Sequence, residues 1–271
     1  MAQVELVQMQ ALDLRAEPPR VCCADWLVLA RTLAPASVDF VYADPPFNTG
    51  DTQTDRAGSY ADRFASAAAY IAWLRERIAA TLPAIKPTGL IALHVDWRTS
   101  HRVRVLLDDL LGEDRFVNHL IWSYGLGGSS PRRFARKHDD ILLYCLDPER
   151  YWFAPPMVPA TSQRMKGQLK KATDVLDIPS INNMAAERVG YPTQKPLALL
   201  ELLVGACCPP PPHAGLVLDP CCGSGTTLVA AAKLGRKWMG CDVNPEAVEI
   251  ARARLGMLGE KAGSGGGDRH R

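Results

Sequence analysis

The sequence has no long apolar run and no pair of cysteines at the spacing of a structural metal site. Its longest apolar stretch, residues 197–208, is interrupted by Glu201 and falls far short of the roughly 20 residues that a membrane helix needs. Its 8 cysteines never occur as C-x-x-C, so we interpret them as buried thiols that pack like small apolar side chains. The first residues carry acids and lack the apolar core of a secretory signal. We therefore expect a cytoplasmic protein without a membrane segment.

The chain also has little net charge, because 31 Lys and Arg stand against 29 Asp and Glu in 271 residues. The charge is unevenly distributed. Residues 131–171 contain nine basic and four acidic side chains, a net charge of +5. On charge alone, a solvated surface and a surface that faces a polyanion such as nucleic acid explain this segment equally well.

Strand-like and helix-like segments alternate along most of the chain, which predicts an α/β fold with a largely parallel sheet. We expect one catalytic domain over residues 1–258, with an inserted region at about 125–190 and a disordered tail at 259–271. Strands are predicted at 38–43, 89–96, 116–124, 140–146, 215–218 and 237–241, and helices at 71–82, 101–111, 196–207, 226–234 and from Pro245 onward.

The first motif with a chemical meaning is a glycine turn, Gly223-Ser224-Gly225, between a predicted strand and a predicted helix. Asp242 ends the next strand, about 20 residues on, where an acid can accept hydrogen bonds from both hydroxyls of a ribose. The turn lacks the Gly-Lys-Thr of a phosphate-binding loop, and Leu228 replaces the third glycine of the dinucleotide fingerprint. S-adenosylmethionine is the remaining common ligand, and a purely structural turn is the alternative for this motif alone.

The second motif is Asp44-Pro45-Pro46-Phe47, directly after a predicted buried strand. Two prolines hold the backbone extended and remove two amide donors, so the Pro45 carbonyl and the Asp44 carboxylate are both free to accept hydrogen bonds. Two acceptors at one strand end suit a planar amino group, whose lone pair they make available for attack. Phe47 can stack on a flat heterocycle. Taken alone, the tetrapeptide is better explained as a Pro-Pro turn.

Together, the two motifs resemble the amino-group DNA methyltransferases, specifically their β-class, in which the D/S/N-P-P-Y/F/W motif precedes the cofactor motif. Here about 175 residues separate Asp44 from Asp219, which opens the segment Asp219-Pro220-Cys221-Cys222-Gly223-Ser224-Gly225. The resemblance covers about residues 20–256 and also includes the segments 137–144 and 190–196. The family often has Phe where this chain has Cys221, which alters packing beside the cofactor.

The resemblance implies a Rossmann-like methyltransferase fold, a target-recognition region as the insertion, S-adenosylmethionine as cofactor and no metal. It implies that the catalytic residues are Asp44, Pro45, Pro46 and Phe47, and that the cofactor-binding residues are Asp25, Lys195, Asp219, Gly223, Gly225, Thr226 and Asp242. The DNA-binding candidates are Arg132, Arg133, Arg136, Lys166, Lys170 and Lys171, each with a solvated surface as its alternative. The expected partner is double-stranded DNA, whose target base must leave the stack to reach the methyl group. A cognate restriction enzyme and a homodimer stay open.

Several neighbouring chemistries do not fit the residues. Pro220-Cys221 lies inside the cofactor turn and lacks the context of carbon-5 cytosine methylation. A zinc deaminase needs H-x-E and P-C-x-x-C, but the chain has His94-Val95-Asp96, and Ser224 stands in place of the second cysteine. Glutamine and ribosomal-RNA methyltransferases usually place the glycine motif first. A non-catalytic DNA-binding module of the same fold remains an alternative from another class.

The target base is predicted from the first position of the Asp44 motif. In the family that the chain resembles, Asp at this position goes mostly with N6-adenine, and N4-cytosine enzymes of the class more often carry Ser. We therefore expect adenine, with N4-cytosine as the alternative, because both bases offer the same kind of exocyclic amine. The recognition sequence is not readable from the residues.

Overall fold

The computed structural model describes most of the chain. The described residues are 18–48, 52–55, 58–61, 64–125, 130–160, 163–182, 185–191 and 193–264, with 52–55, 58–61 and 259–264 described for the backbone alone. Part of the polar stretch that follows Phe47, and tail residues 265–271, lie outside this set.

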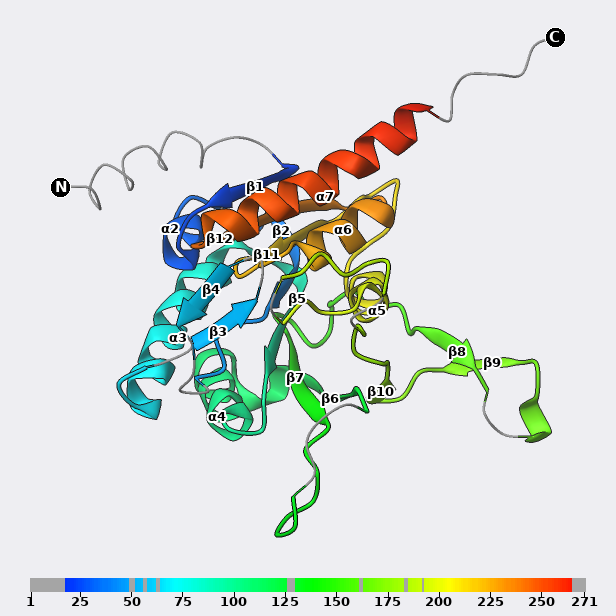
Figure 1. Ribbon diagram of the computed structural model, residues 1–271, viewed down its shortest axis with the longest axis horizontal. Coiled ribbons are helices and arrows are strands. Elements are labelled where there is room, and N and C mark those ends of the chain that lie inside the picture. Colours follow the sequence, from blue (N-terminus) through cyan, green and yellow to red (C-terminus); the bar gives the residue numbers. More distant parts are fainter. Residues whose placement is uncertain are drawn as a thin grey trace.

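An eight-stranded sheet forms the centre of the molecule (Figure 1). All its neighbouring strands pair in parallel except the seventh strand of the chain, β7, which is antiparallel to both of its neighbours. The mostly parallel α/β fold predicted from the sequence is therefore confirmed. In spatial order the strands are β1 (Arg20–Cys23), β12 (Lys237–Asp242), β11 (Leu216–Asp219), β2 (Val38–Ala43), β5 (Ile85–Val95), β7 (His138–Cys145), β6 (Phe116–Ser123) and β10 (Val175–Asp177).

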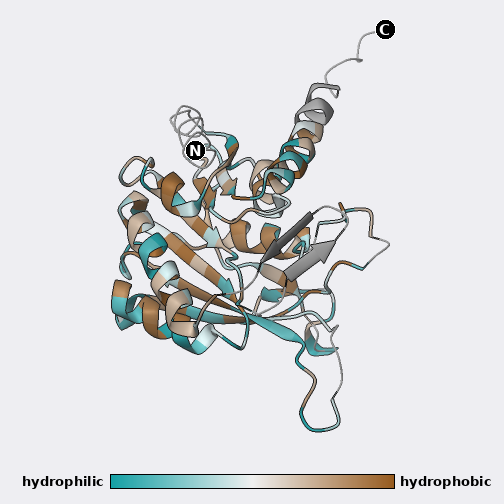
Figure 2. Cartoon of the chain, turned by 60° about the vertical axis from the view of Figure 1, so that its left-hand side comes forward, coloured by the Kyte–Doolittle hydropathy of each residue, from teal (hydrophilic) through white to brown (hydrophobic). Residues whose placement is uncertain are grey.

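Helices cover both faces of this sheet, which explains why its central strands are apolar on both sides. Every residue of β2 and of β11 is buried, as expected for strands with helices above and below. One core contains side chains of α2 (Trp26–Ala30), α3 (Ala67–Thr81) and α4 (Ser100–Leu111). The core on the other face contains α5 (Leu197–Cys207) and α6 (Thr226–Lys233), and α7 (Pro245–Ser264) packs against α6. Figure 2 shows the hydrophobic residues on these central strands and helices.

Short elements complete the described chain. Two antiparallel hairpins stand outside the main sheet: β3 (Thr52–Asp55) with β4 (Gly58–Ala61), and β8 (Met157–Pro159) with β9 (Leu169–Lys171). Single 3-10 turns are η1 (Leu82–Ala84), η2 (Glu113–Arg115) and η3 (Gln163–Met165). In Figure 1 the β8–β9 hairpin and the connection between β6 and β7 project from the body of the molecule.

The region expected as an insertion at about 125–190 contributes two strands to the main sheet, β7 in its middle and β10 at its edge. The sequence signal was weak there because β10 has only three residues, of which two are exposed. Helix α7 continues to Ser264, six residues into the segment expected as a disordered tail from 259. Each side chain in that extension is small or polar, so hydrophobic periodicity could not predict it.

Candidate functional site

The carboxyl ends of β1, β12, β11 and β2 meet at one edge of the sheet, and the two motifs found in the sequence meet there. Because α6 follows β11 on one face and α3 follows β2 on the other, this is the topological switch point where α/β sheets form ligand crevices. A cavity of about 310 Å3 opens at this edge. Its lining includes ten of the predicted residues: Asp25, Asp44, Pro45, Pro46, Phe47, Lys195, Asp219, Gly223, Thr226 and Asp242.

Gly225 is the predicted cofactor residue that does not line the cavity. It is the N-cap of α6 with a φ of 76°, and a Cβ there would lie 2.7 Å from the Cβ of Ala251 on α7. Its role is therefore to let two helices approach closely. Gly223, with a φ of 48°, does face the cavity, and a Cβ there would come within 3.0 Å of the Tyr191 ring.

Asp242 organises the glycine turn from the end of β12. Its Oδ2 accepts a hydrogen bond from the Gly223 amide at 2.9 Å, and its Oδ1 accepts one from the Asn244 amide at 2.9 Å. Burial raises the pKa of this carboxyl, against the lowering effect of these backbone amides. Each carboxylate oxygen has a further lone pair, so Asp242 can accept additional hydrogen bonds from a ligand in the cavity.

Asp219 ends β11 at the floor of the same cavity and is 2% exposed. Burial raises its pKa to about 7, an effect that the nearby charges of Asp44 and Asp242 increase and that hydrogen bonds from Thr227 and the Cys221 amide oppose. With Asp25 at the rim, four carboxyl groups and one lysine, Lys195, line the cavity. This charge balance favours a ligand that carries positive charge.

Asp44 lies between this acidic cavity and the ring of Phe47. Its Oδ2 accepts from the Lys195 ammonium at 2.6 Å, whereas its Oδ1 is buried and is not hydrogen-bonded in the structure. The same ammonium lies 5.1 Å from the centroid of the Phe47 ring. One carboxylate oxygen is thus held in place by a neighbouring cation, and the other is available to an N–H donor.

Asp25 closes the opposite side of the cavity. Its Oδ1 accepts from the Leu27 amide at 2.8 Å and caps α2, while its Oδ2 forms an ion pair with Arg77 at 2.7 Å. The Arg77 guanidinium lies 4.1 Å from the centroid of the Trp73 ring, which also lines the cavity. Sequence reasoning missed Arg77 and Trp73, because they lie on α3 and reach the site only through packing.

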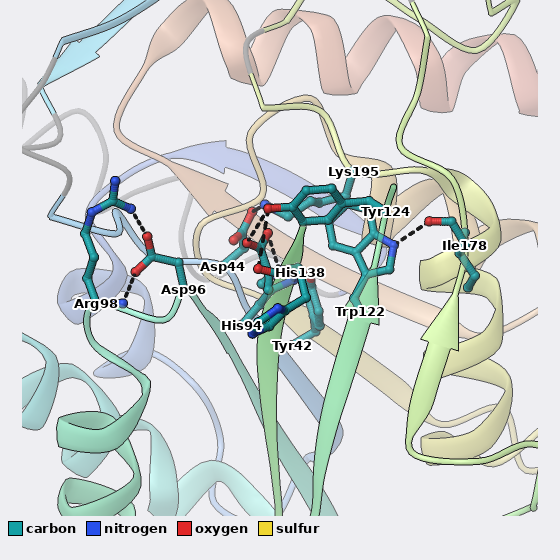
Figure 3. A network of polar contacts seen from close by, with 11 residues as sticks. Tyr42, Asp44, His94, Asp96, Arg98, Trp122, Tyr124, His138, Ile178 and Lys195 are labelled. Carbon is teal, nitrogen blue, oxygen red and sulfur yellow. Dashed lines mark hydrogen bonds and ion pairs between the residues drawn. The ribbon is translucent and has the colours of Figure 1, made fainter. Parts of the chain in front are cut away.

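A second group that the sequence analysis missed lies beside Phe47: it consists of His94 and of Tyr42, which also lines the cavity. Figure 3 shows both side chains. The His94 ring stacks on the Phe47 ring with centroids 5.8 Å apart and planes at 28°. His94 and Tyr42, joined by a hydrogen bond of 2.6 Å, are both buried. The sequence analysis used His94 only to reject a deaminase. The feature that could have identified His94 as a site residue is its position at the end of β5, beside β2.

The cysteines behave as predicted from their spacing. Within the described residues none of the eight cysteines forms a disulfide, and six of them are buried. Burial raises the pKa of the Cys221 thiol well above its usual range, and the carboxylates Asp242 and Asp219 add to the effect. Cys221 is therefore protonated and a poor nucleophile. This agrees with the rejection of carbon-5 chemistry.

The basic candidates lie on two projections. Arg132 and Arg133 are exposed on the connection between β6 and β7, where the Arg136 guanidinium lies 3.3 Å from the centroid of the Trp97 ring. Lys166 follows η3, and Lys170 and Lys171 lie on β9. The structure thus divides these six residues between a projection beside the catalytic motif and a separate hairpin.

Within the described chain, no helix is long and apolar enough to cross a membrane. No group of three or more His, Cys, Asp or Glu among the described residues is arranged to hold a metal ion.

The family comparison agrees with the motifs. Residues 38–253 match the N6/N4 DNA methylase family, and the chain therefore belongs to this family of DNA methyltransferases. Its relatives include the Type II methyltransferase M.ScaI of Streptomyces caespitosus, 28% identical over 251 residues that cover 85% of this chain and 79% of the relative. The DNA adenine methyltransferase YhdJ of Escherichia coli (strain K12) is 26% identical over 263 residues, 88% of this chain and 83% of the relative.

Solved structures of DNA methyltransferases share the fold. The PvuII DNA methyltransferase (cytosine-N4-specific) superposes with a TM-score of 0.66 at 17% identity, over 89% of this chain and 87% of that one. The complex of M1.HpyAVI with SAM superposes with a TM-score of 0.61 at 21% identity, over 87% of this chain and 98% of that one. The Rossmann-like fold implied by the sequence resemblance is therefore confirmed.

Proposed function

We propose that the chain transfers a methyl group from S-adenosylmethionine to the exocyclic amine of adenine, N6, in duplex DNA. The observation that carries the proposal is that the two carboxylate oxygens of Asp44 have different surroundings. One of its oxygens is held by Lys195, and the other is buried, unpartnered and next to a cavity lined by acids. An amino group that donates to this free oxygen would be placed beside a cationic ligand in the cavity.

The cavity suits S-adenosylmethionine in size and charge. Its volume of about 310 Å3 is at the lower end of the range for small-molecule sites, and its four carboxyl groups complement a ligand with a sulfonium and an ammonium group. When bound, this cofactor supplies a methyl group on a positively charged sulfur. Asp242 would hold the ribose hydroxyls, Asp25 the adenine side, and Asp219, Thr226 and Lys195 the methionine end. M1.HpyAVI, which shares the fold, has been solved as a complex with SAM.

Asp44 and Pro45 would prepare the target amine for attack. The free Oδ1 of Asp44 and the carbonyl of Pro45 each accept one N–H, which favours a pyramidal nitrogen whose lone pair points away from both acceptors. As the nitrogen gains its methyl group it must lose a proton, and Asp44 is the hydrogen-bonded base through which that proton can leave to solvent. This step needs neither a metal nor a covalent enzyme intermediate.

The DNA base would reach this site only outside the helix, because the amine must meet the methyl group in line. The ring of Phe47 would stack on the extruded base, and Lys195 contacts both this ring and Asp44. We assign the phosphate contacts to Arg132, Arg133, Arg136, Lys166, Lys170 and Lys171, which lie on the two projections.

Adenine is proposed over cytosine on two grounds. Asp at the first motif position goes mostly with adenine in the family that the sequence resembles, and the relative YhdJ is named a DNA adenine methyltransferase. The second candidate is N4-cytosine, because the PvuII enzyme with the same fold is named cytosine-N4-specific.

The test is direct identification of the product. The protein is incubated with S-adenosylmethionine and duplex DNA of mixed sequence, the DNA is digested to nucleosides, and the methylated species is identified by mass spectrometry. N6-methyladenine is the expected product. N4-methylcytosine would support the same methyl-transfer reaction but show that the target base is cytosine. DNA binding without any methylated product would replace the proposal with a non-catalytic DNA-binding module.

A further inference from the structure

A line of hydrogen bonds runs from Tyr42, near the end of β2, through His94 to the start of β7 (Figure 3). The Tyr42 hydroxyl and His94 Nδ1 are 2.6 Å apart, and His94 Nε2 and Asp139 Oδ2 are 3.2 Å apart. His94 is 0% exposed and Tyr42 is 1% exposed. Tyr42 also lines the cavity, but the proposed mechanism gives no role to the polar groups of these three side chains.

The surroundings favour one arrangement of protons along this line. Burial raises the pKa of Asp139, but hydrogen bonding and charge from His94, the Lys195 charge and a Tyr124 hydrogen bond outweigh it, and the net pKa is lowered. Burial and the charges of Asp44 and Asp219 raise the pKa of Tyr42 well above its usual range. With Asp139 ionised, Nε2–H donates to Asp139, while Nδ1 is hydrogen-bonded to the protonated Tyr42 hydroxyl. The imidazole ring is then fixed at both nitrogens.

The imidazole ring that is fixed in this way stacks on the ring of Phe47. Its face meets the Phe47 ring at 5.8 Å, while the rings of Tyr42 and Trp122 meet it edge-on at 6.0 and 5.6 Å. Stacked and edge-to-face contacts of this kind favour particular relative ring orientations. The plane of Phe47 therefore depends on the plane of His94.

The other end of the line reaches the basic connection between β6 and β7. Tyr124, where this connection begins, lies with its hydroxyl 3.4 Å from Asp139 Oδ1, and its amide donates to the Lys137 carbonyl at 3.1 Å. Trp122 packs edge-on against Tyr124 at 5.0 Å and donates from Nε1 to the Ile178 carbonyl at 2.8 Å, just after β10. Tyr124 and Lys137, which flank the connection between β6 and β7, are thus hydrogen-bonded to each other, and Tyr124 also contacts Asp139. Trp122 links the same ring cluster to the end of β10.

We propose that His94 is a positioning residue that couples the DNA-facing connection between β6 and β7, through Tyr124 and Asp139, to the orientation of the Phe47 ring, so that an extruded base is captured. This inference rests on the proposed function and adds the means by which DNA contact prepares the base site. Trp122 and Tyr42 hold the His94 ring from two sides, and Asp139 links its Nε2 to the connection.

The test compares variants that keep or remove the Asp139 link. Asp139→Asn retains an oxygen that can accept from Nε2, whereas Asp139→Ala removes it, and His94→Phe retains a ring under Phe47 without either hydrogen bond. His119→Asn is the matched control, because His119 Nε2, on β6, pairs with Asp140 Oδ1 on β7 at 2.7 Å, next to Asp139 in the sequence. The wild-type chain is first used to map, on plasmid DNA, the sequence that it methylates.

Two readouts follow on duplexes that contain this sequence: the single-turnover rate of methyl transfer, and the fluorescence of 2-aminopurine placed next to the target base. We expect Asp139→Ala and His94→Phe to lower the rate by about 100-fold, as for a misplaced reacting group. They should also lose most of the fluorescence increase that reports the captured base. Asp139→Asn and His119→Asn should stay near the wild-type values, and all four variants should keep the wild-type Kd for S-adenosylmethionine.

Wild-type rate and fluorescence in Asp139→Ala and His94→Phe would overturn the proposal. The proposal would also be overturned if Asp139→Asn lost as much rate and fluorescence as Asp139→Ala. An equal loss of S-adenosylmethionine affinity would overturn it too, because either result indicates general damage to the site. If the wild-type chain methylates no DNA at all, the proposed function fails instead, and the two failures are thereby distinguished.

Discussion

At the residue scale, Lys195 is the side chain on which the geometry of the catalytic motif depends most. Its ammonium holds Asp44 Oδ2 and lies over the Phe47 ring, although Lys195 comes from a segment 151 positions further along the chain. Its own position is supported by Gln194, whose side chain accepts from the Val189 amide at 2.9 Å and donates to the Glu187 carbonyl at 2.7 Å. The end of the inserted region is thereby attached to the catalytic acid.

Lys195→Met is expected to lower kcat by about 10- to 100-fold. Without the ammonium group the Asp44 carboxylate is no longer held in place, and the target amine is then less well positioned in the transition state. Lys233→Met is the control, since Lys233 pairs with Glu201 between α6 and α5, away from the cavity. Steady-state methyl transfer to plasmid DNA measures both variants. Equal activity of the Lys195 and Lys233 variants would contradict the role given to Lys195.

The raised pKa of Asp219 predicts that cofactor binding depends on pH. Its pKa is raised to about 7, first of all by burial, and the ammonium of S-adenosylmethionine pairs only with the ionised form. Binding therefore releases a proton below about pH 7, and the Kd should be about tenfold larger at pH 6 than at pH 8. Equilibrium dialysis without DNA measures this. Asp219→Asn should bind more weakly with a flatter pH profile, and a wild-type Kd independent of pH would refute the assignment.

The acids of the site were predictable at this scale, because Asp44, Asp219 and Asp242 each end a buried strand in a recognisable motif. Gly225 was placed in the right turn, but its contact with Ala251 depends on where α7 packs. Tyr42 and Trp73 could not be assigned, because nothing local in the sequence distinguishes a buried aromatic ring beside the site from one elsewhere in the core. For His94, its position at the end of a strand was the single clue.

At the element scale, the connection between β6 and β7 is the segment to which we assign the DNA contacts of Arg132 and Arg133, which are both exposed. Tyr124, where the connection begins, contacts Asp139. Phe134, next to Arg133, is 97% exposed. The charge of this segment was compatible with a DNA-facing surface and with a solvated one, and its DNA-binding role stays a prediction. The short strands β8, β9 and β10 were not predicted, because three residues are too few to show a periodicity.

Arg132→Ala with Arg133→Ala is expected to weaken binding to every DNA sequence and to lower the salt dependence. Two lost phosphate contacts reduce the slope of log K against log salt concentration by about 1.8. The control is Arg31→Ala with Lys237→Ala, which removes two exposed charges near the opposite edge of the sheet, before β2 and at the start of β12. Binding titrations at several salt concentrations measure the slope, and an unchanged slope in the first variant would remove these arginines from the interface.

At the scale of the whole molecule, the parallel strands bring residues from distant parts of the chain to one edge. Asp25, Asp44, Asp219 and Asp242 follow β1, β2, β11 and β12 or end them, and the sheet order places these strands side by side. Alternation of strands and helices predicted the parallel sheet. The antiparallel position of β7 could not be predicted, because it depends on which sheet edge the chain returns to after β6.

Because the cofactor would bind where four strands converge, it should stabilise the whole fold. At about 100 times its Kd, S-adenosylmethionine should add about 2.7 kcal/mol to the free energy of unfolding, which raises Tm by several degrees in a thermal melt. Asp242→Ala should lose most of this shift, since Asp242 holds the glycine turn as well as the ligand. The same shift in the variant and in the wild type would place the cofactor elsewhere.

The central claim is that Asp44 holds the target amine and that the acidic cavity beside it holds the methyl donor. The most direct test measures two quantities on Asp44→Ala: the transfer of labelled methyl groups from S-adenosylmethionine to duplex DNA, and the Kd for S-adenosylmethionine. The account predicts that transfer is abolished, because the amine loses its acceptor, while the Kd remains within about twofold of wild type. Retained transfer, or a loss of cofactor binding as large as the loss of transfer, would contradict it.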